Sequence, residues 1–169
     1  DDVVFGTIVS GRPAAVPDVD RMVGAFINAV PVRIRTSGAT LRDVAVRLQR
    51  ELIESEPYHC VPLANIQNAT ALGRDLFTHL MVIENYPVEQ QLADAGESAG
   101  LRIVGLEAHD RTHYSFTITV IPGDELTIQL QYDARAHAPS LVRRVGDHYL
   151  RVLLACAADD DQPLESLEI

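Results

Sequence analysis

Apolar side chains occupy every second position on both sides of the Pro-Gly-Asp sequence at 122–124. An alternation with a period of two is typical of a half-buried strand, and Pro-Gly-Asp favours a turn. Residues 112–133 are therefore predicted to form a β-hairpin. One face of each strand carries its apolar side chains, which are Tyr114, Phe116, Ile118 and Val120, then Leu126, Ile128, Leu130 and Tyr132.

Two longer segments instead repeat apolar residues at helical spacing. The first spans about residues 41–56, with Thr40 as its expected N-cap, Asp43 three residues later and Pro57 as its stop. The second spans about residues 140–157. The apolar stripes are formed by Leu41, Val44, Leu48 and Leu52 in the first helix and by Leu141, Val145, Val152 and Cys156 in the second.

Shorter patterns complete the predicted order of elements. Residues 3–10 and 76–83 are apolar runs that favour buried strands, and residues 29–36 favour a half-buried strand despite Pro31. A short helix is expected at residues 18–27. Mixed strands with two helices predict a two-layer α/β sandwich, in which a mixed sheet packs on the helices centred near residues 48 and 148.

Composition narrows the classes of function. The chain has 169 residues, a net charge of −10 and a sequence pI near 4.9, and it carries no basic stripe of the kind that binds nucleic acid. No apolar run reaches the roughly 20 residues that cross a bilayer. We expect one globular, cytoplasmic unit with no nucleic-acid or membrane partner. Cys60 and Cys156 lack metal or disulfide spacing and are expected to be buried thiols, and residues 159–161 are expected to serve solubility alone.

No self-contained active site emerges from the sequence. A nucleophile elbow is absent, because Ser10-Gly11 lacks the preceding glycine of G-x-S-x-G. His59 and Cys60 are adjacent and would point to opposite faces of an extended segment. His109 and His113 would lie about 13 Å apart in a strand, which is too far for one metal ion. We therefore expect no metal and no directly bound cofactor.

Six stretches, in order along the chain, carry a resemblance to a known family. They are residues 2–13 (DVVFGTIVSGRP), 22–33 (MVGAFINAVPVR), 58–67 (YHCVPLANIQ), 76–87 (LFTHLMVIENYP), 112–116 (THYSF) and 132–133 (YD). The second is similar to the motif (I/V)-G-x-F-(V/I)-N-T-x-x-x-R, and the fourth to a strand that ends in ENYP. Together they resemble the condensation domains of nonribosomal peptide synthetases, and in particular the C-terminal lobe. Ala29 replaces the motif threonine, and His113 and Ser115 depart from the usual TnYPL.

The resemblance implies a fold like half of chloramphenicol acetyltransferase, in which two similar lobes meet at a tunnel. In that family a histidine of H-H-x-x-x-D-G, in the N-terminal lobe, acts where an acceptor amine attacks a donor thioester. This sequence has no His-His pair, and it starts without methionine in the apolar run Val3-Val4-Phe5. It is therefore expected to be a piece, residues 1–169 of a C-terminal lobe, that shapes one wall of the tunnel and forms no amide bond alone.

The same resemblance implies partners and site residues. The partners would be the N-terminal lobe, a peptidyl carrier protein that delivers phosphopantetheine, and an adjoining adenylation domain. Asn28 and Ser10 are the candidates for tunnel-facing groups that bond substrate or the pantetheine arm; backbone-bonding roles remain the alternative for both. Arg12 and Arg33 are expected to be structural ion-pair partners. Asn85 and Tyr86 are expected to reach the other lobe, and the loop at 88–100 to be poorly ordered without it.

Other functions remain open at this point. A condensation-like module could recruit partner enzymes without catalysing a reaction, and a stand-alone acyltransferase of the same superfamily is a third reading. An intact H-H-x-x-x-D-G upstream would favour catalysis over recruitment. The face that packs on the missing lobe would be partly apolar, so self-association over the Ser10 and Asn28 side is expected. The sequence leaves the joined amino acids, the donor stereochemistry and the product undetermined.

Overall fold

The structure is a computed structural model, and it describes residues 1–13, 16–84 and 112–167. Five strands form one sheet in the order β2-β1-β3-β4-β5. The outer pairs, β2 with β1 and β4 with β5, are antiparallel, while β1 with β3 and β3 with β4 are parallel. The predicted α/β class with a mixed sheet is confirmed. The strands are β1 (Asp2–Val9), β2 (Asn28–Arg35), β3 (His79–Ile83), β4 (Phe116–Ile121) and β5 (Thr127–Tyr132).

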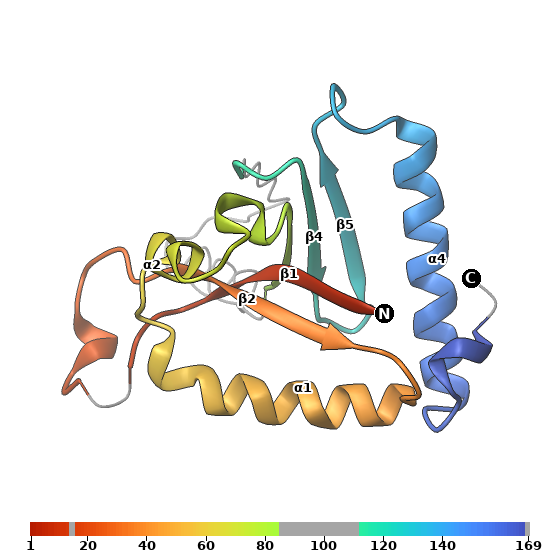
Figure 1. Cartoon of the computed structure of the whole chain (residues 1–169), viewed down its shortest axis with the longest axis horizontal. Helices are drawn as coiled ribbons and strands as arrows, with labels where there is room; N and C mark the ends of the chain where they lie inside the picture. Colours follow the sequence, from red (N-terminus) through yellow and green to blue (C-terminus); the bar gives the residue numbers. More distant parts are fainter. Residues whose placement is uncertain (14–15, 85–111, 168–169) are drawn as a thin grey trace, which may run out of the picture.

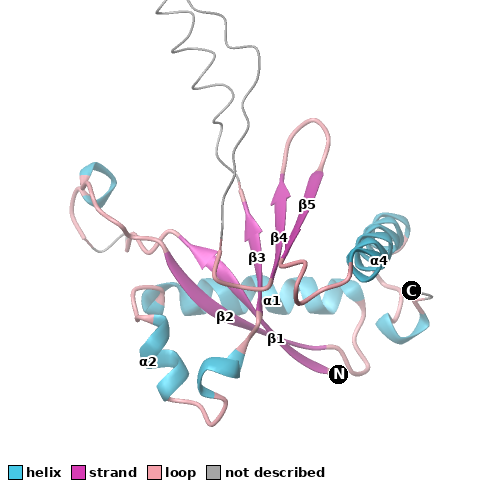
Figure 2. Cartoon of the chain, turned by 90° about the horizontal axis from the view of Figure 1, so that it is seen from above, coloured by secondary structure: helices cyan, strands magenta, loops and turns pink. Residues whose placement is uncertain are grey.

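Two long helices and one short helix surround this sheet. Figure 1 shows α1 crossing beneath β1 and β2, with α4 running beside β5. In both Figure 1 and Figure 2, α2 lies at the opposite end of the molecule from α4. The two predicted long helices are therefore present. The helices are α1 (Leu41–Ser55), α2 (Leu63–Asn68) and α4 (Pro139–Ala158), and the 3-10 turns are η1 (Val19–Arg21), η2 (Glu56–Tyr58), η3 (Gly73–Leu76) and η4 (Leu164–Ser166).

The start of α1 follows from two residues. The Thr40 side chain accepts a hydrogen bond from the backbone N–H of Asp43 at 3.1 Å, and the Asp43 carboxylate accepts one from the backbone N–H of Thr40 at 3.1 Å. These reciprocal bonds form a capping box, which satisfies two backbone donors at the helix end. The pKa of Asp43 is lowered mainly by its hydrogen bond with the Thr40 backbone and secondly by its hydrogen bond with the Thr40 side chain. Thr40 is thus the N-cap that the sequence predicts.

One face of the sheet carries a row of large side chains. The strand register brings Phe5 opposite Val32 and aligns His79, Phe116 and Tyr132. The Phe5 and His79 rings are stacked with their centroids 6.2 Å apart, and burial lowers the pKa of His79. These side chains therefore lie in one row across strands that are distant in sequence.

Close backbone approaches set the spacing of neighbouring elements. An added Cβ on Gly6 would lie 2.3 Å from the Phe77 ring, so only glycine leaves room there for this buried aromatic side chain. On α4, an added Cβ at Gly146 would lie 3.2 Å from the Leu130 side chain of β5. Pro31 is tolerated within β2 because this strand lies at the edge of the sheet. Gly6 and Gly146 therefore permit the close approach of β1 to Phe77 and of α4 to β5.

The acidic segment after α4 has a structural role, which corrects the expectation that it serves solubility alone. The Arg42 guanidinium donates to the carboxylates of Asp160 at 2.7 Å and Asp161 at 2.8 Å, while its backbone N–H donates to the Asp160 carbonyl at 2.8 Å. The backbone N–H of Leu164 then donates to the Ala39 carbonyl at 3.0 Å. These contacts fasten the segment after α4 to the beginning of α1.

Several predicted boundaries are wrong. The helix expected at 18–27 is only the 3-10 turn η1, and Asp18, with a φ of 55°, makes no side-chain capping bond. The strand expected at 76–83 begins at His79, because Leu76 ends η3 and residues 77 and 78 connect it to the strand. The thiols are not both buried: Cys60 is exposed and Cys156 is half-buried. The loop expected at 88–100 lies outside the described residues.

Candidate functional site

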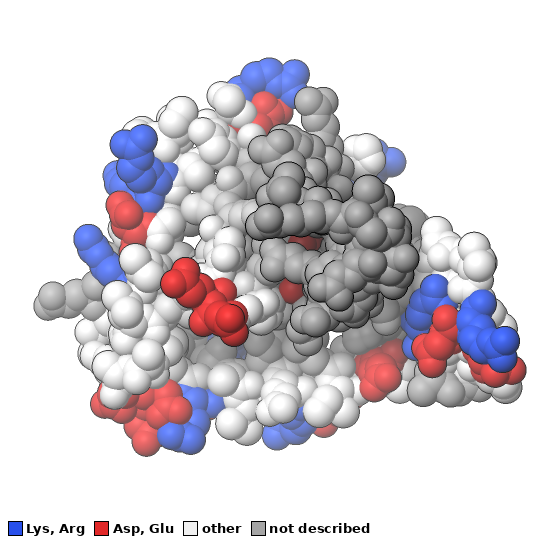
Figure 3. Space-filling model, turned by 180° about the vertical axis from the view of Figure 1, so that it is seen from behind, with Lys and Arg blue, Asp and Glu red and all other residues white. Residues whose placement is uncertain are grey.

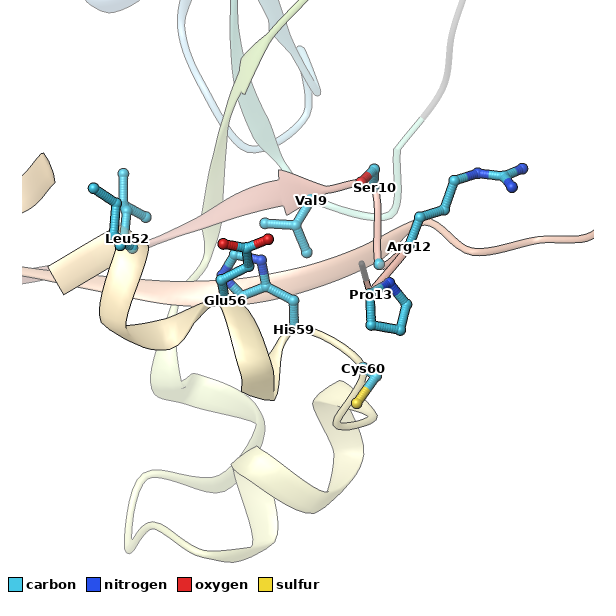
Figure 4. Close-up of a pocket in the computed structure, with 10 residues that line it drawn as sticks. Val9, Ser10, Arg12, Pro13, Leu52, Glu56, His59 and Cys60 are labelled. Carbon is cyan, nitrogen blue, oxygen red and sulfur yellow. The ribbon is translucent and has the colours of Figure 1, made fainter. Parts of the chain in front are cut away.

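A cavity of about 370 Å³ lies where the end of β1 faces the end of α1. Figure 4 shows Val9 from β1 on one side, with Leu52, Glu56 and His59 on the other. Its lining combines apolar side chains with one carboxylate, one guanidinium, one imidazole, one thiol and one hydroxyl. The lining residues are Val9, Ser10, Gly11, Arg12, Pro13, Leu52, Ile53, Glu56, His59 and Cys60.

Ser10 is the first residue after β1, and it lines this cavity. The residue is exposed, and no hydrogen bond of its hydroxyl is found among the described residues. A free hydroxyl can both donate and accept a hydrogen bond. Ser10 therefore occupies a place from which a bound molecule can be contacted, and its tunnel-facing role stays a prediction.

Asn28 is the first residue of β2, and its carboxamide is engaged within the chain. Its Nδ2 donates to the carbonyl oxygens of His59 at 2.8 Å and Val61 at 2.7 Å. Both N–H groups of the amide are thereby used, so only Oδ1 remains to accept a hydrogen bond. Asn28 thus bonds the backbone at the start of a strand, and it holds the segment that supplies His59 to the cavity.

The turn after α1 contains a Ser–His pair that the sequence did not lead us to expect. The Ser55 hydroxyl donates to the Leu52 carbonyl at 2.8 Å, and Ser55 Oγ lies 2.9 Å from His59 Nε2. When the one hydroxyl hydrogen of Ser55 is directed to the Leu52 carbonyl, Oγ accepts a hydrogen bond from Nε2–H. In that arrangement the pair orients the imidazole and does not activate the serine. The spacing of Glu56, His59 and Cys60, at i, i+3 and i+4, is the sequence signal that could have found this face of the turn.

Arg12 does not form the expected ion pair among the described residues. Its guanidinium donates to the carbonyl oxygens of Val19 and Met22, the latter at 3.1 Å, and lies 4.2 Å from the centre of the Phe26 ring. These contacts hold the loop that follows β1. Figure 4 shows the side chain extending away from Glu56 and out of the cavity. Arg12 is thus a loop-organising residue.

Arg33 lies far from this cavity and pairs with Asp2. Its guanidinium donates two hydrogen bonds to the Asp2 carboxylate, at 2.6 and 2.8 Å, and both side chains are about half exposed. The hydrogen bond from Arg33 is the main cause that lowers the pKa of Asp2. Since Asp2 begins β1 and Ser10 follows its end, the two sites are about 25 Å apart at 3.3 Å per residue. Arg33 and Ser10 therefore do not belong to one site.

A second Ser–His contact occurs beside the hairpin. Ser115 Oγ lies 3.1 Å from His137 Nε2, and the His137 ring meets the Phe116 ring edge-on with centroids 5.7 Å apart. Asp133 is nearby in sequence, but its carboxylate is bound by Arg135, which lowers the pKa of Asp133 to about 2. The Asp133 carboxylate is thus engaged by Arg135. The contact between Ser115 and His137 joins the hairpin to the turn before α4.

Three candidate residues, Asn85, Tyr86 and His109, lie outside the described residues. Within residues 1–13, 16–84 and 112–167, no three His, Cys, Asp or Glu side chains are grouped so as to hold a metal ion. No described helix is long and apolar enough to cross a membrane. On the face shown in Figure 3, acidic and basic side chains of the described residues are interspersed and form no basic stripe.

Solved structures show where this fold occurs. A structure described as "The crystal structure of CT mutant" has a TM-score of 0.79 and 19% identity, and the likeness covers 99% of this chain and 39% of that one. The starter condensation domain of the rhizomide synthetase has a TM-score of 0.71 and 18% identity, with 99% and 40% covered. The first condensation domain of the CDA synthetase has a TM-score of 0.69 and 14% identity, with 99% and 37% covered. These likenesses show that the fold is that of part of a condensation domain.

Sequence comparison is more specific. Bacitracin synthase 3 of Bacillus licheniformis is 34% identical over 172 residues, which cover 100% of this chain and 3% of that protein. Tyrocidine synthase 2 of Brevibacillus parabrevis is 35% identical over 162 residues, covering 94% of this chain and 4% of that protein. The chain thus spans a small fraction of the length of these relatives. The family model described as "Condensation domain" matches residues 1–169. The chain therefore belongs to the condensation-domain family.

Proposed function

We propose that this chain is the C-terminal lobe of a nonribosomal peptide synthetase condensation domain and takes part in amide-bond formation only with an N-terminal lobe. The proposal rests mainly on one observation: the condensation-domain model matches residues 1–169, and this chain contains no His-His pair. The coverage of 37–40% of condensation-domain structures supports it, because a single lobe accounts for less than half of such a domain.

In the proposed reaction, the nitrogen of an acceptor amine attacks the carbonyl carbon of a donor thioester. A C–N bond forms, the C–S bond breaks, and one amine proton is transferred as the carrier thiol leaves. A histidine of H-H-x-x-x-D-G in the N-terminal lobe would assist this proton transfer. Peptidyl carrier proteins would deliver both groups on phosphopantetheine, and an adenylation domain would adjoin the lobe in the parent chain.

The distribution of exposed apolar side chains supports a surface that packs against another lobe. Among the described residues only seven apolar side chains are buried, which is a small core for this sheet, whereas several large ones are exposed on the loop after β1. Exposed apolar groups that lie together mark interaction surfaces. The exposed side chains on this loop are Val16, Met22, Val23 and Ile27. In the proposed domain this loop packs on the N-terminal lobe, and in the isolated chain it promotes self-association.

Within this proposal the residues have distinct roles. Ser10 faces the tunnel, where its hydroxyl bonds the pantetheine arm or the oxyanion of the tetrahedral intermediate. Asn28 acts one step away, because it positions the segment at His59 that borders the same cavity. Arg12 shapes the loop that meets the other lobe, and Asn85 and Tyr86 also reach toward that lobe. Arg33 stabilises the far end of the paired strands β1 and β2.

The proposal is tested by mixing this chain with a separately made N-terminal lobe and assaying amide formation between two carrier-bound aminoacyl thioesters. Activity is expected only in the mixture, and it should be lost when both histidines of the N-terminal motif are replaced by alanine. Amide formation by this chain alone would contradict the assignment. A folded, assembled pair that is inactive would instead favour a module that recruits partner enzymes.

A further inference from the structure

The cavity at the end of α1 carries an electrostatic feature that the proposed function does not use. Glu56 is the C-cap of α1 and contributes its carboxylate to the lining. Among the described residues, no cationic side chain lies within ion-pair distance of it, whereas Glu54, two residues earlier, approaches Arg50 at 3.9 Å. Glu56 is therefore the acidic group of this cavity, and its charge is not neutralised by a described side chain.

The helix itself adds negative charge at the same place. The carbonyl groups at a helix C-terminus act as about half a negative charge, and basic residues in the last turn commonly offset it. The last turn of α1 contains no basic residue. Because α1 has 15 residues, its dipole is well developed where it ends beside the cavity. The carboxylate and the helix end thus favour the same kind of ligand, a cation.

The other polar groups do not cancel this charge. Arg12 is the cationic residue of the lining, but its side chain extends away from Glu56, and its guanidinium donates to two backbone carbonyls and lies over the Phe26 ring. His59 Nε2 lies 2.9 Å from Ser55 Oγ, and the imidazole lines the same cavity as the Glu56 carboxylate.

The remaining lining determines the body of the ligand. Val9, Pro13, Leu52 and Ile53 supply an apolar surface, and about 370 Å³ is enough space for a small organic molecule. A hydrated metal ion would gain no stabilisation from contact with these apolar side chains. From this geometry we propose that the cavity is a binding site for an organic cation, a primary ammonium group attached to an apolar body. This inference does not rest on the proposed function.

Cys60 provides a direct probe, because its exposed thiol lines the same cavity. In a Cys156→Ala chain it is the single thiol. Its thiolate attacks the sulfenyl sulfur of a methanethiosulfonate reagent, a disulfide forms, and methanesulfinate leaves. The cationic 2-aminoethyl reagent and the anionic 2-sulfonatoethyl reagent are compared by mass spectrometry, each normalised to its rate on the urea-unfolded chain. The folded chain is expected to favour the cation on the order of threefold to tenfold, as for a charge several ångströms away in a partly wet site.

Matched variants assign the preference to one carboxylate. Glu56→Gln should remove most of it, leaving the smaller part due to the helix end, whereas Glu54→Gln, on the same helix but outside the cavity lining, should retain it in full. Ligand binding is read out as protection: 2-phenylethylammonium should slow modification of Cys60 by an uncharged reagent, with half-protection at about 1–10 mM for a ligand of this size. The uncharged 2-phenylethanol, at equal ionic strength, should protect far less. Equal rates for the two charged reagents, an unaffected preference in Glu56→Gln, or no protection by the ammonium at about 20 mM would each overturn the proposal.

Discussion

Asn28 Nδ2 donates a hydrogen bond to the carbonyl oxygen of His59 at 2.8 Å, which joins the start of β2 to the turn after α1. The same nitrogen serves Val61 at 2.7 Å. Asn28→Ala would leave two half-buried carbonyls without these donors, so we expect a loss of about 1–3 kcal/mol in the free energy of unfolding. Urea denaturation measures it, with the exposed Asn65→Ala as the control. An unchanged midpoint for Asn28→Ala would show that the two bonds do not hold this segment.

The contact of Arg42 with the segment after α4 predicts a local effect. Arg42→Ala should speed hydrogen exchange at the backbone N–H of Leu164, because the side chain that ties Asp160 and Asp161 to α1 is gone. Exposed ion pairs contribute little to global stability, so the unfolding midpoint should change only slightly. Arg50→Ala, which removes a single contact at 3.9 Å, is the control and should leave that exchange rate unchanged. If the exchange rate of the Leu164 N–H in Arg42→Ala equalled that in Arg50→Ala, Arg42 would not hold the segment after α4 in place.

The capping box predicts a loss of helix stability. Thr40→Ala removes the side-chain acceptor for the Asp43 N–H and should lower the free energy of unfolding by about 1 kcal/mol. Thr40→Ser keeps the hydroxyl and should recover most of this loss. The pKa of Asp43 is lowered in the fold, so its contribution is present above its ordinary pKa of 3.8 and is lost as the pH falls through the lower folded value. Thr40→Ala should weaken that acid dependence, as followed by circular dichroism.

His79 predicts a second dependence on pH at milder acidity. Burial lowers its pKa below the ordinary 6.5, so the unfolded chain takes up a proton before the folded chain does. Its favourable contribution is therefore complete above 6.5 and is lost as the pH falls through the folded value. Urea denaturation between about pH 8 and pH 5 should show the decline, and His79→Phe, which keeps a ring beside Phe5, should flatten it. The exposed His148→Gln should behave like the parent chain; a flat profile in that control would assign the effect to His148.

The elements predicted correctly are those that local pattern specifies. The alternation at residues 116–132 repeats often enough to identify the hairpin, and Thr40 with Asp43 marks a helix start three residues apart. The helix expected at residues 18–27 is wrong, because Val23 and Ile27 are exposed and belong to a loop held by Arg12. That loop is organised by contacts of one arginine with two carbonyls, which no periodicity signals.

The site was harder to predict, because its residues meet only in the fold. Asn28 and His59 are separated by 31 positions, and nothing local to either residue signals their hydrogen bond. The resemblance directed attention to Ser10 and Asn28, which do lie at the same end of the paired strands β1 and β2. It did not single out Glu56, because its significance comes from the end of α1 and from the absence of a cationic partner among the described residues.

Disulfide trapping at Ser10, the residue proposed to face the tunnel, tests the assignment most directly. In a Cys60→Ala, Cys156→Ala chain assembled with an N-terminal lobe, Ser10→Cys is presented with a carrier protein whose pantetheine thiol is activated as a mixed disulfide. Ser37→Cys, beyond the opposite end of the paired strands β1 and β2, is the matched control. We predict rapid cross-linking of the carrier at position 10 and little at position 37. Equal trapping at the two positions would contradict the claim that this chain forms the wall of the tunnel along which substrates arrive.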